Sequence, residues 1–346
     1  CADFIEAHKE SLLILEMGLG KTIITLTAIL NLMFDRFEIS RVLVVAPLRV
    51  GRDVWPEEAR LWSHTNFLSM SVAIGSPKQR IAALSANSDI CVINRENVKW
   101  LVDCLEKRRV PWPFDMVVLD ESSSFKNHRA KRFRALRAVR PRISRIVELT
   151  GTPSPHGLTD LWAQLYLLDG GARLGRTIST YREMFFVPDK RNRTTIFSYA
   201  PKDGAADAIY RLISDICISM KSEDYLQLPD LIYDDIPVKL DDKAQRAYDS
   251  MERDMLLEVD DETVTATTAA TLTGKLLQLC NGAVYSEDGE VIPVHDCKIE
   301  AFMETVEQLN GQHAIVYYYF QHDRDRILHA LRNSHLRVRV YKEIGR

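Results

Sequence analysis

The sequence predicts an α/β protein whose first half is a doubly wound parallel sheet. Short apolar runs rich in Val and Ile alternate with segments of helical periodicity from Leu12 to about Asp169. These runs lack the polar alternation of a half-exposed strand, so helices should cover both faces of the sheet. Ligands of such sheets bind where the parallel strands end, and candidate functional residues are therefore sought at those ends.

Five apolar runs of strand length define this first half, and a helical pattern follows each of the first four: Leu12–Leu15, Val42–Pro47, Asp89–Asn94, Met116–Glu121 and Arg145–Pro153. Together they predict a first domain over residues 1–169. The alternation stops between residues 170 and 230, where Gly, Pro and polar residues surround an aromatic patch. We expect an inserted or linking subdomain there.

A second α/β pattern occupies residues 231–346. Its expected elements, in order, are a strand over 232–240, a helix over Asp241–Glu258, a Thr- and Ala-rich helix running into Lys275–Gly282, a helix over Lys298–Leu309 and a strand over Ala314–Phe320. This stretch has room for about half the strands of a second doubly wound domain.

Composition excludes several classes of protein. Among the 346 residues, 46% are hydrophobic and 27% charged, as in ordinary globular proteins. The net charge of −3 means that any nucleic-acid surface must be a local patch. The six cysteines show no CxxC spacing, which argues against zinc and disulfides, and no run is long enough to span a membrane. We therefore expect a cytoplasmic protein without zinc or membrane partners, and a Cys at position 1 suggests that residues precede it.

The segment Glu16–Thr22, with the sequence EMGLGKT, lies between a predicted strand and a predicted helix. This context is typical of a P-loop, in which backbone N–H groups of Met17, Gly18, Leu19 and Gly20 approach phosphates. Lys21 would reach the β- and γ-phosphates, and Thr22 would offer its hydroxyl to Mg²⁺. Leu15 replaces the first glycine of the general pattern. The alternative is a glycine-rich turn that binds no ligand.

Asp120 and Glu121 end the strand that begins at Met116. Adjacent acidic residues there can give one carboxylate to Mg²⁺ and another to a water aligned with the γ-phosphate. The alternative is a helix N-cap with favourable first-turn charge. The upstream P-loop sequence favours the catalytic interpretation.

Thr150, Gly151 and Thr152 also follow a strand, in the sequence LTGTP. Two hydroxyls around a glycine could bond the carboxylates of the preceding motif and sense the γ-phosphate, which would make this turn a coupling device. A plain hydroxyl-bonded turn before Pro153 is the alternative.

Nucleic-acid contact has two candidate surfaces. One is a stretch with no acidic residue, whose basic side chains include Lys126, Arg129, Lys131, Arg132, Arg134, Arg137, Arg140, Arg142 and Arg145. A solvated helix face balanced by acidic neighbours explains this stretch equally well. The other comprises Pro47 and Arg49, at the end of a strand. Trp55 and Trp62 are predicted to pack in the core, and His156 to have an ordinary role.

These segments resemble, in order, motifs I, Ia, II and III of superfamily 2 helicase-like ATPases, and Swi/Snf-type DNA translocases are the most similar. The quoted residues are EMGLGKT, Val42–Trp62, Leu119–Asn127 and LTGTP. Motif II reads DESSSFKN, without the usual histidine, a form that resembles phage and prophage members. Similarity continues in Lys275–Tyr285 and Ala314–Ile327.

The resemblance implies RecA-like domains and an ATP-dependent translocase on double-stranded DNA that uses Mg²⁺, in a bacterial or phage-infected cytosol. It places the adenine-contacting glutamine before Ala2 and the arginine fingers after Arg346. A chain without the fingers is expected to bind ATP and hydrolyse it slowly.

Two alternatives stay open. The first is an RNA or single-strand helicase of the same superfamily, and the second is a nucleotide-switched DNA-binding or recruitment module with little turnover. A P-loop metabolic kinase is disfavoured, because LTGTP and a second α/β unit have no role there. A monomer is favoured.

Overall fold

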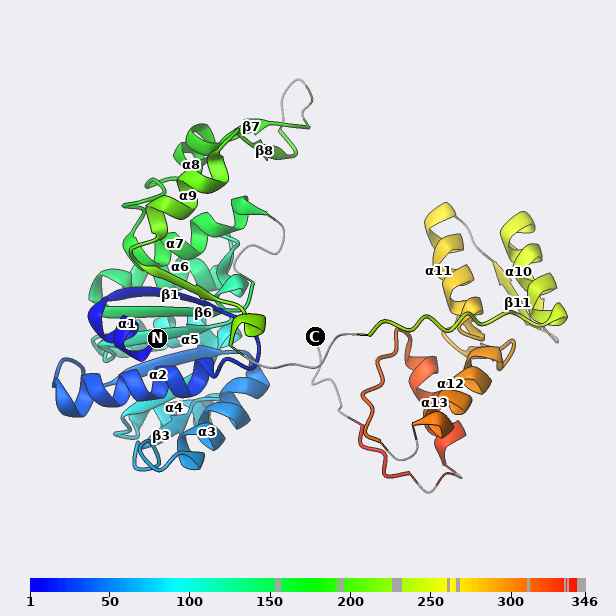
Figure 1. Cartoon of the computed structure of the whole chain (residues 1–346), viewed down its shortest axis with the longest axis horizontal. Helices are drawn as coiled ribbons and strands as arrows, with labels where there is room; N and C mark the ends of the chain where they lie inside the picture. The colour runs from blue at the N-terminus through cyan, green and yellow to red at the C-terminus, as the bar shows by residue number, and fades with distance from the viewer. Residues whose placement is uncertain are drawn as a thin grey trace. The chain divides into compact units, whose positions relative to one another are not determined.

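The structure is a computed structural model that describes residues 1–152, 157–190, 192, 196–225, 232–259, 262–265, 268–309, 312–332, 334 and 336–340. The chain divides into two compact units, Cys1–Pro229 and Asp230–Arg346. The first unit contains a large sheet between layers of helices, and the second contains helices with short pairs of strands (Figure 1).

A seven-stranded parallel sheet forms the centre of the first unit. In the spatial order β3-β4-β2-β5-β6-β1-β9, its strands are Met70–Val72, Ile90–Asn94, Val42–Ala46, Met116–Asp120, Arg145–Thr150, Glu10–Leu15 and Cys217–Met220. Every neighbouring pair is parallel, so all seven strands end at one edge. The predicted doubly wound α/β fold is therefore confirmed for this unit.

Helices bury both faces of the sheet, which explains the nearly continuous apolar runs. Adjacent residues of one strand, such as Leu12 and Leu13, belong to different apolar clusters. On one face pack α1 (Ala2–Ala7), α2 (Lys21–Leu30) and α3 (Trp55–Leu61). On the other face pack α4 (Pro77–Ser85), α5 (Val98–Arg108), α6 (Lys131–Val139) and α7 (Leu161–Asp169).

The predicted linking region contains regular structure. Helix α8 (Ile178–Phe185) leads into an antiparallel hairpin of β7 (Phe186–Pro188) and β8 (Tyr199–Pro201), which projects from the unit in Figure 1. After α9 (Ala205–Ile213) the chain returns to the sheet as β9, which pairs with β1. The division into 1–169, 170–230 and 231–346 stays a prediction, although β9 extends the first sheet.

Four helices and two antiparallel strand pairs are described in the second unit. The helices are α10 (Asp242–Asp254), α11 (Ala269–Cys280), α12 (Cys297–Gln308) and α13 (Gln321–Leu331). The strand pairs are β10 (Leu256–Val259) with β11 (Glu262–Thr265), and β12 (Ala283–Tyr285) with β13 (Val291–Pro293). The three predicted helices are present, and the first ends early because Met255 adopts a left-handed φ of 55°.

Two predicted strands are wrong. Residues 232–240 and 314–320 are described, and neither segment forms a strand. A strand needs a neighbour to satisfy its backbone groups, and none of the described residues pairs with either segment. The apolar side chains there remain largely exposed, including Tyr317 at 89%.

Candidate functional site

The turn between β1 and α2 has the backbone geometry of a P-loop. Gly18 and Gly20 have φ values of 86° and 69°, in the left-handed region where residues with a Cβ are strained. Gly20 is the N-cap of the ten-residue helix α2, so the first helical N–H groups face the turn. The sequence EMGLGKT therefore forms the predicted strand-turn-helix.

Lys21 folds back over this turn. Its Nζ donates to the carbonyl oxygen of Leu15 at 2.7 Å and to that of Glu16 at 3.3 Å. Because β6 lies beside β1, the turn after β6 packs against the lysine. A Cβ built on Gly151 would lie 3.6 Å from the Leu15 carbonyl oxygen and 4.0 Å from Lys21 Nζ. The structure thus brings the predicted motif of Thr150, Gly151 and Thr152 to the P-loop lysine.

Asp120 is the last residue of β5 and is only 7% exposed. Its Oδ2 accepts a hydrogen bond of 2.9 Å from the indole Nε1 of Trp55. Burial raises the pKa of Asp120 above its ordinary value, and the neighbouring Glu121 raises it further. The Trp55 bond and the charge of Lys21 act in the opposite direction by favouring the carboxylate.

Glu121 has a left-handed backbone, with φ 55° and ψ 58°. Such a conformation is strained for a residue other than glycine and is frequent at functional sites. The residue precedes a 3₁₀ turn, Ser122–Phe125, but its side chain makes no capping hydrogen bond. Glu121 thus occupies the N-cap position of this turn, as the alternative interpretation expects, but its half-buried carboxylate does not bond the turn as a cap.

The strand order gathers the three motifs. Strands β5, β6 and β1 are neighbours, and they end at Asp120, Thr150 and Leu15 respectively. Thr150 is buried, and its Oγ1 accepts a 3.1 Å hydrogen bond from the backbone N–H of Thr152. Half-buried Thr22 follows Lys21 in the first turn of α2. Backbone N–H groups at a helix N-terminus, a lysine, a hydroxyl and two carboxylates thus share one edge of the sheet.

The residues at this edge fit a magnesium nucleotide. The left-handed glycines allow the backbone N–H groups to approach phosphates, and an added Cβ at Gly151 would contact the lysine. Carboxylate and hydroxyl oxygens are the donors that Mg²⁺ prefers. Asp120 and Thr22 could supply them, whereas Lys21 could pair with phosphate charge.

Ser222 is a site residue that the sequence did not reveal. Its backbone N–H donates to Glu16 Oε2 at 2.8 Å, and its hydroxyl donates to the Met17 carbonyl oxygen at 2.9 Å. The backbone bond from Ser222 lowers the pKa of Glu16. Ser222 follows β9, so only the pairing of β9 with β1 brings it to the P-loop. No local pattern signals a contact between residues so distant in sequence.

A buried polar cluster lies beneath the motif II turn. The hydroxyl of Ser122 donates to Gln164 Oε1 at 3.0 Å, and both side chains are fully buried. Glu148 of β6 is also fully buried, which raises its pKa well above that of an ordinary carboxyl, while the Ser122 hydroxyl opposes the shift. Ser122 stands directly after the two motif II carboxylates, so motif II is linked to helix α7 through Gln164.

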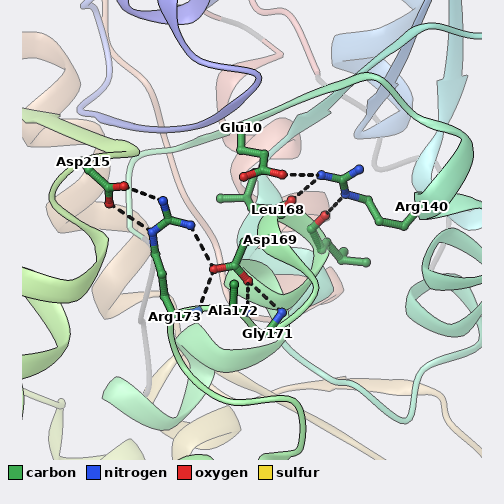
Figure 2. Close-up of polar contacts among 9 residues, drawn as sticks. Glu10, Arg140, Leu168, Asp169, Gly171, Ala172, Arg173 and Asp215 are labelled. Atoms are coloured by element: carbon green, nitrogen blue, oxygen red, sulfur yellow. Dashed lines mark hydrogen bonds and ion pairs between the residues drawn. The ribbon is translucent and has the colours of Figure 1, made fainter.

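The basic stretch after motif II proves to be partly structural. Arg140 donates to the carbonyl oxygens of Leu167 and Ile143. Figure 2 shows that it also bonds Leu168 and pairs with Glu10, at 3.0 Å. Arg145 is 5% exposed and bonds backbone carbonyls around α1 as well as Glu38. These two arginines hold the fold together and cannot track phosphates. The basic stretch is therefore neither a continuous DNA-binding surface nor a fully solvated helix face, the two alternatives that the sequence left open.

Figure 2 also shows a second arginine bridge, at the end of α7. Arg173 pairs with Asp169 at 3.2 Å and with Asp215, and Asp169 accepts backbone N–H bonds from Gly171 and Ala172. The bridge ties the turn after α7 to the residues just before β9. It therefore supports the return of the chain to the sheet.

Four residues were predicted to contact DNA. Pro47 is half-buried and Arg49 exposed, and both follow β2 at the edge where the motifs gather. Lys126 pairs with Asp160 at 3.4 Å, and Arg129 is exposed. The basic side chains of the stretch that remain exposed are Arg129, Lys131, Arg134, Arg137 and Arg142.

The predictions for two tryptophans and the residues after LTGT have mixed outcomes. Trp55 is fully buried, as predicted, but Trp62 is 44% exposed and only bonds Glu58 on the surface, so its predicted core role is wrong. Pro153 and His156 lie outside the described residues.

Within the part of the chain that the structure describes, no helix has the length and apolarity to traverse a bilayer.

The sheet and its P-loop turn define the class of protein as a P-loop NTPase with a RecA-like fold. Residues 5–283 match the SNF2-related domain. The chain is 38% identical over 321 residues to "Putative protein p41" of Acyrthosiphon pisum secondary endosymbiont phage 1, covering 91% of this chain and 69% of that protein. The chain belongs to the SNF2-related family of helicase-like superfamily 2 ATPases.

Two further comparisons extend this finding. The chain is 25% identical over 228 residues to the "DNA repair and recombination protein RAD54-like" of Gallus gallus, covering 61% of this chain but only 30% of that protein. The solved SWI2/SNF2 ATPase core of Sulfolobus solfataricus, in complex with double-stranded DNA, matches with a TM-score of 0.54. At 19% identity, covering 95% of this chain and 68% of that one, it shows the shared fold.

Proposed function

We propose that this protein is an ATP-dependent motor that moves along duplex DNA, with Lys21, Asp120 and Glu121 as its catalytic residues. The observation that carries the proposal is the meeting of the P-loop, the motif II carboxylates and the LTGT turn at one sheet edge. A metabolic NTPase has no need for a turn packed on the P-loop lysine. Membership of the SNF2-related family supports the motor interpretation.

The P-loop would bind the triphosphate. Backbone N–H groups of Met17, Gly18, Leu19 and Gly20 would face the phosphates, because the left-handed glycines turn the backbone toward them. Lys21 would leave the carbonyl oxygens of Leu15 and Glu16 and pair with phosphate oxygens. These carbonyl bonds place the ammonium group at the turn that would receive the phosphates.

Thr22 and Asp120 would hold Mg²⁺, and Glu121 would orient the attacking water. Mg²⁺ bound there would neutralise charge that develops on the phosphates. Glu121 suits the role of orienting residue, because it is the N-cap residue of the following turn and yet its side chain makes no capping hydrogen bond. The water oxygen would then be held in line with the γ-phosphate while Glu121 accepts its proton.

Thr150 and Thr152 would report loss of the γ-phosphate. Their mutual hydrogen bond and the position of Gly151 beside Lys21 give this turn contact with the nucleotide site. Motif II is bonded to α7 through Ser122 and Gln164, which offers a second connection.

We propose Pro47, Arg49, Lys126 and Arg129 as the DNA-contacting residues, acting on the phosphate backbone without reading bases. They follow β2 and β5 at the edge where the strands end. The Sulfolobus neighbour was solved on double-stranded DNA, and this supports a duplex substrate for the present chain. We propose that the protein acts as a monomer.

The test is ATP hydrolysis by the full-length protein with duplex DNA, single-stranded DNA or RNA. Glu121→Gln should lower the DNA-stimulated rate by about 10² to 10⁴, the usual contribution of a positioned base, while nucleotide binding persists. Glu57→Gln, an exposed change on α3, is the matched control and should be neutral. Absence of stimulation by any DNA would contradict the motor, and stimulation by RNA alone would move the substrate to RNA.

A further inference from the structure

Trp55 connects two motifs that are far apart in sequence. We propose that Trp55 is a positioning residue for the magnesium-binding carboxylate: its indole N–H holds one oxygen of Asp120 so that the other faces the metal. The inference rests on the proposed function, in which Asp120 binds Mg²⁺. The inference adds Trp55 to the proposed metal site, whereas the sequence motifs predict only that Trp55 packs in the core.

The geometry of this contact is well defined. Trp55 is fully buried, and its Nε1 lies 2.9 Å from Asp120 Oδ2. This hydrogen bond is buried in the first unit. Trp55 opens α3, immediately after a π-helical turn, Val50–Val54. A π turn inserts one extra residue into a helix and so changes the direction of the side chains that follow. It is therefore a local feature that sets the direction of the indole.

A glycine allows this helical segment to approach the sheet. A Cβ built on Gly51 would lie 3.1 Å from Val92 Cγ1 in β4, closer than most real contacts. The close approach carries Trp55 inward to β5, where Asp120 ends the strand. The hydrogen bond thus depends on an arrangement of α3, β4 and β5 and is not a chance surface contact.

An indole N–H only donates a hydrogen bond, so Trp55 can hold a carboxylate oxygen of Asp120 in place but cannot itself bind a metal ion. Glu121, a like charge, and Lys21, an opposite charge, are the other charged groups that act on this carboxyl.

The experiment compares Trp55→Phe with Trp62→Phe in this chain. Phenylalanine keeps an aromatic ring in the core but removes the donor, whereas Trp62 donates to Glu58 on the surface. Binding of a fluorescent ADP is measured as a function of Mg²⁺ concentration. Trp55→Phe should raise the Mg²⁺ concentration for half-maximal binding about tenfold, as expected for a charge-assisted hydrogen bond, and leave metal-free binding unchanged.

The outcomes separate the inference from the proposed function. An unchanged Mg²⁺ requirement in Trp55→Phe, with normal binding by the unsubstituted protein, would overturn the role of Trp55 alone. Failure of the unsubstituted protein to bind any nucleotide would overturn both. A loss of thermal stability with no change in Mg²⁺ dependence would also contradict the inference, because simple packing predicts that result.

A second measurement applies if Trp55→Phe does not fold. Indole ¹⁵N–H resonances of the unsubstituted protein are followed as Mg²⁺ and ADP are added. One resonance, distinct from the one lost in Trp62→Phe, should shift with the metal and should shift again in Asp120→Asn. If no indole resonance responds to both changes, the hydrogen bond does not couple to the metal site and the inference fails.

Discussion

At the scale of single residues, Glu148 is a carboxyl whose pKa burial raises well above the ordinary value. It lies fully buried on β6, where Ser122, Arg140 and Asp169 are the groups that act on it, and burial raises its pKa well above the ordinary range. The folded protein therefore retains a proton that the unfolded chain releases once the pH exceeds the ordinary carboxyl value. The stability due to this protonated carboxyl is complete at low pH and is lost as the pH rises toward the raised pKa.

Glu148→Gln should remove this pH dependence. At pH 8 the melting temperature of the variant should exceed that of the unsubstituted protein. The increase should be about 2 to 4 °C for each kcal/mol by which the substitution raises the free energy of unfolding of a unit of this size. At pH 4 the two melting temperatures should be equal. Thermal unfolding across this pH range is the measurement, with the exposed Glu106→Gln as control. A difference that is constant with pH, or largest in acid, would show that Glu148 is ionised in the fold.

Trp55 and Trp62 show how far residue-level prediction reaches. Both lie on one helical segment and both donate to a carboxylate, yet one is buried against Asp120 and the other is on the surface. Their sequence contexts cannot separate them, because the intervening helix geometry decides which ring points inward. Asp120 itself was predictable, since it ends an apolar strand and is followed by a second acid.

At the scale of elements, β9 joins the P-loop to the end of the first unit. Ser222 follows β9 and bonds both Glu16 and Met17, so the last strand of the sheet restrains the first turn of the nucleotide site. The chain leaves the first unit soon after this contact, at Pro229. The contact therefore fixes the P-loop turn against the residue that follows β9.

Ser222→Ala should weaken nucleotide binding. It removes one hydrogen bond to the P-loop backbone, worth about 1 kcal/mol, so the Kd for ADP should rise by about threefold to tenfold. Titration with fluorescent ADP measures the effect. The matched control is Ser214→Ala, since the Ser214 hydroxyl bonds a helix carbonyl away from the site. Equal Kd values for the two variants would mean that β9 does not restrain the turn.

Prediction of elements succeeded where burial on both faces gave long apolar runs, as in β2, β4, β5 and β6. It missed β3 and β9, because both strands are short and only half-buried and so give no long apolar run. The predicted strands over 232–240 and 314–320 are wrong, because apolar composition indicates a strand but does not show whether a partner strand is present. Pairing is a tertiary property, so local pattern alone could not decide these cases.

At the scale of the whole molecule, the proposed nucleotide site lies at one edge of a RecA-like sheet. The net charge of −3 and the structural use of Arg140 and Arg145 leave a modest basic surface for DNA. Binding by few phosphate contacts should depend on salt and little on base sequence. The motifs and the fold class followed from the sequence, whereas the division of the arginines between structural and exposed roles required the packed structure.

The central claim is that ATP hydrolysis at this site drives movement along duplex DNA. Its most direct test is displacement of a third strand from a DNA triplex by the full-length protein. The account predicts displacement that requires ATP and duplex DNA, that Glu121→Gln abolishes and that leaves the duplex strands paired. Hydrolysis on duplex DNA without displacement of the third strand would contradict the claim and would favour a nucleotide-switched DNA-binding protein.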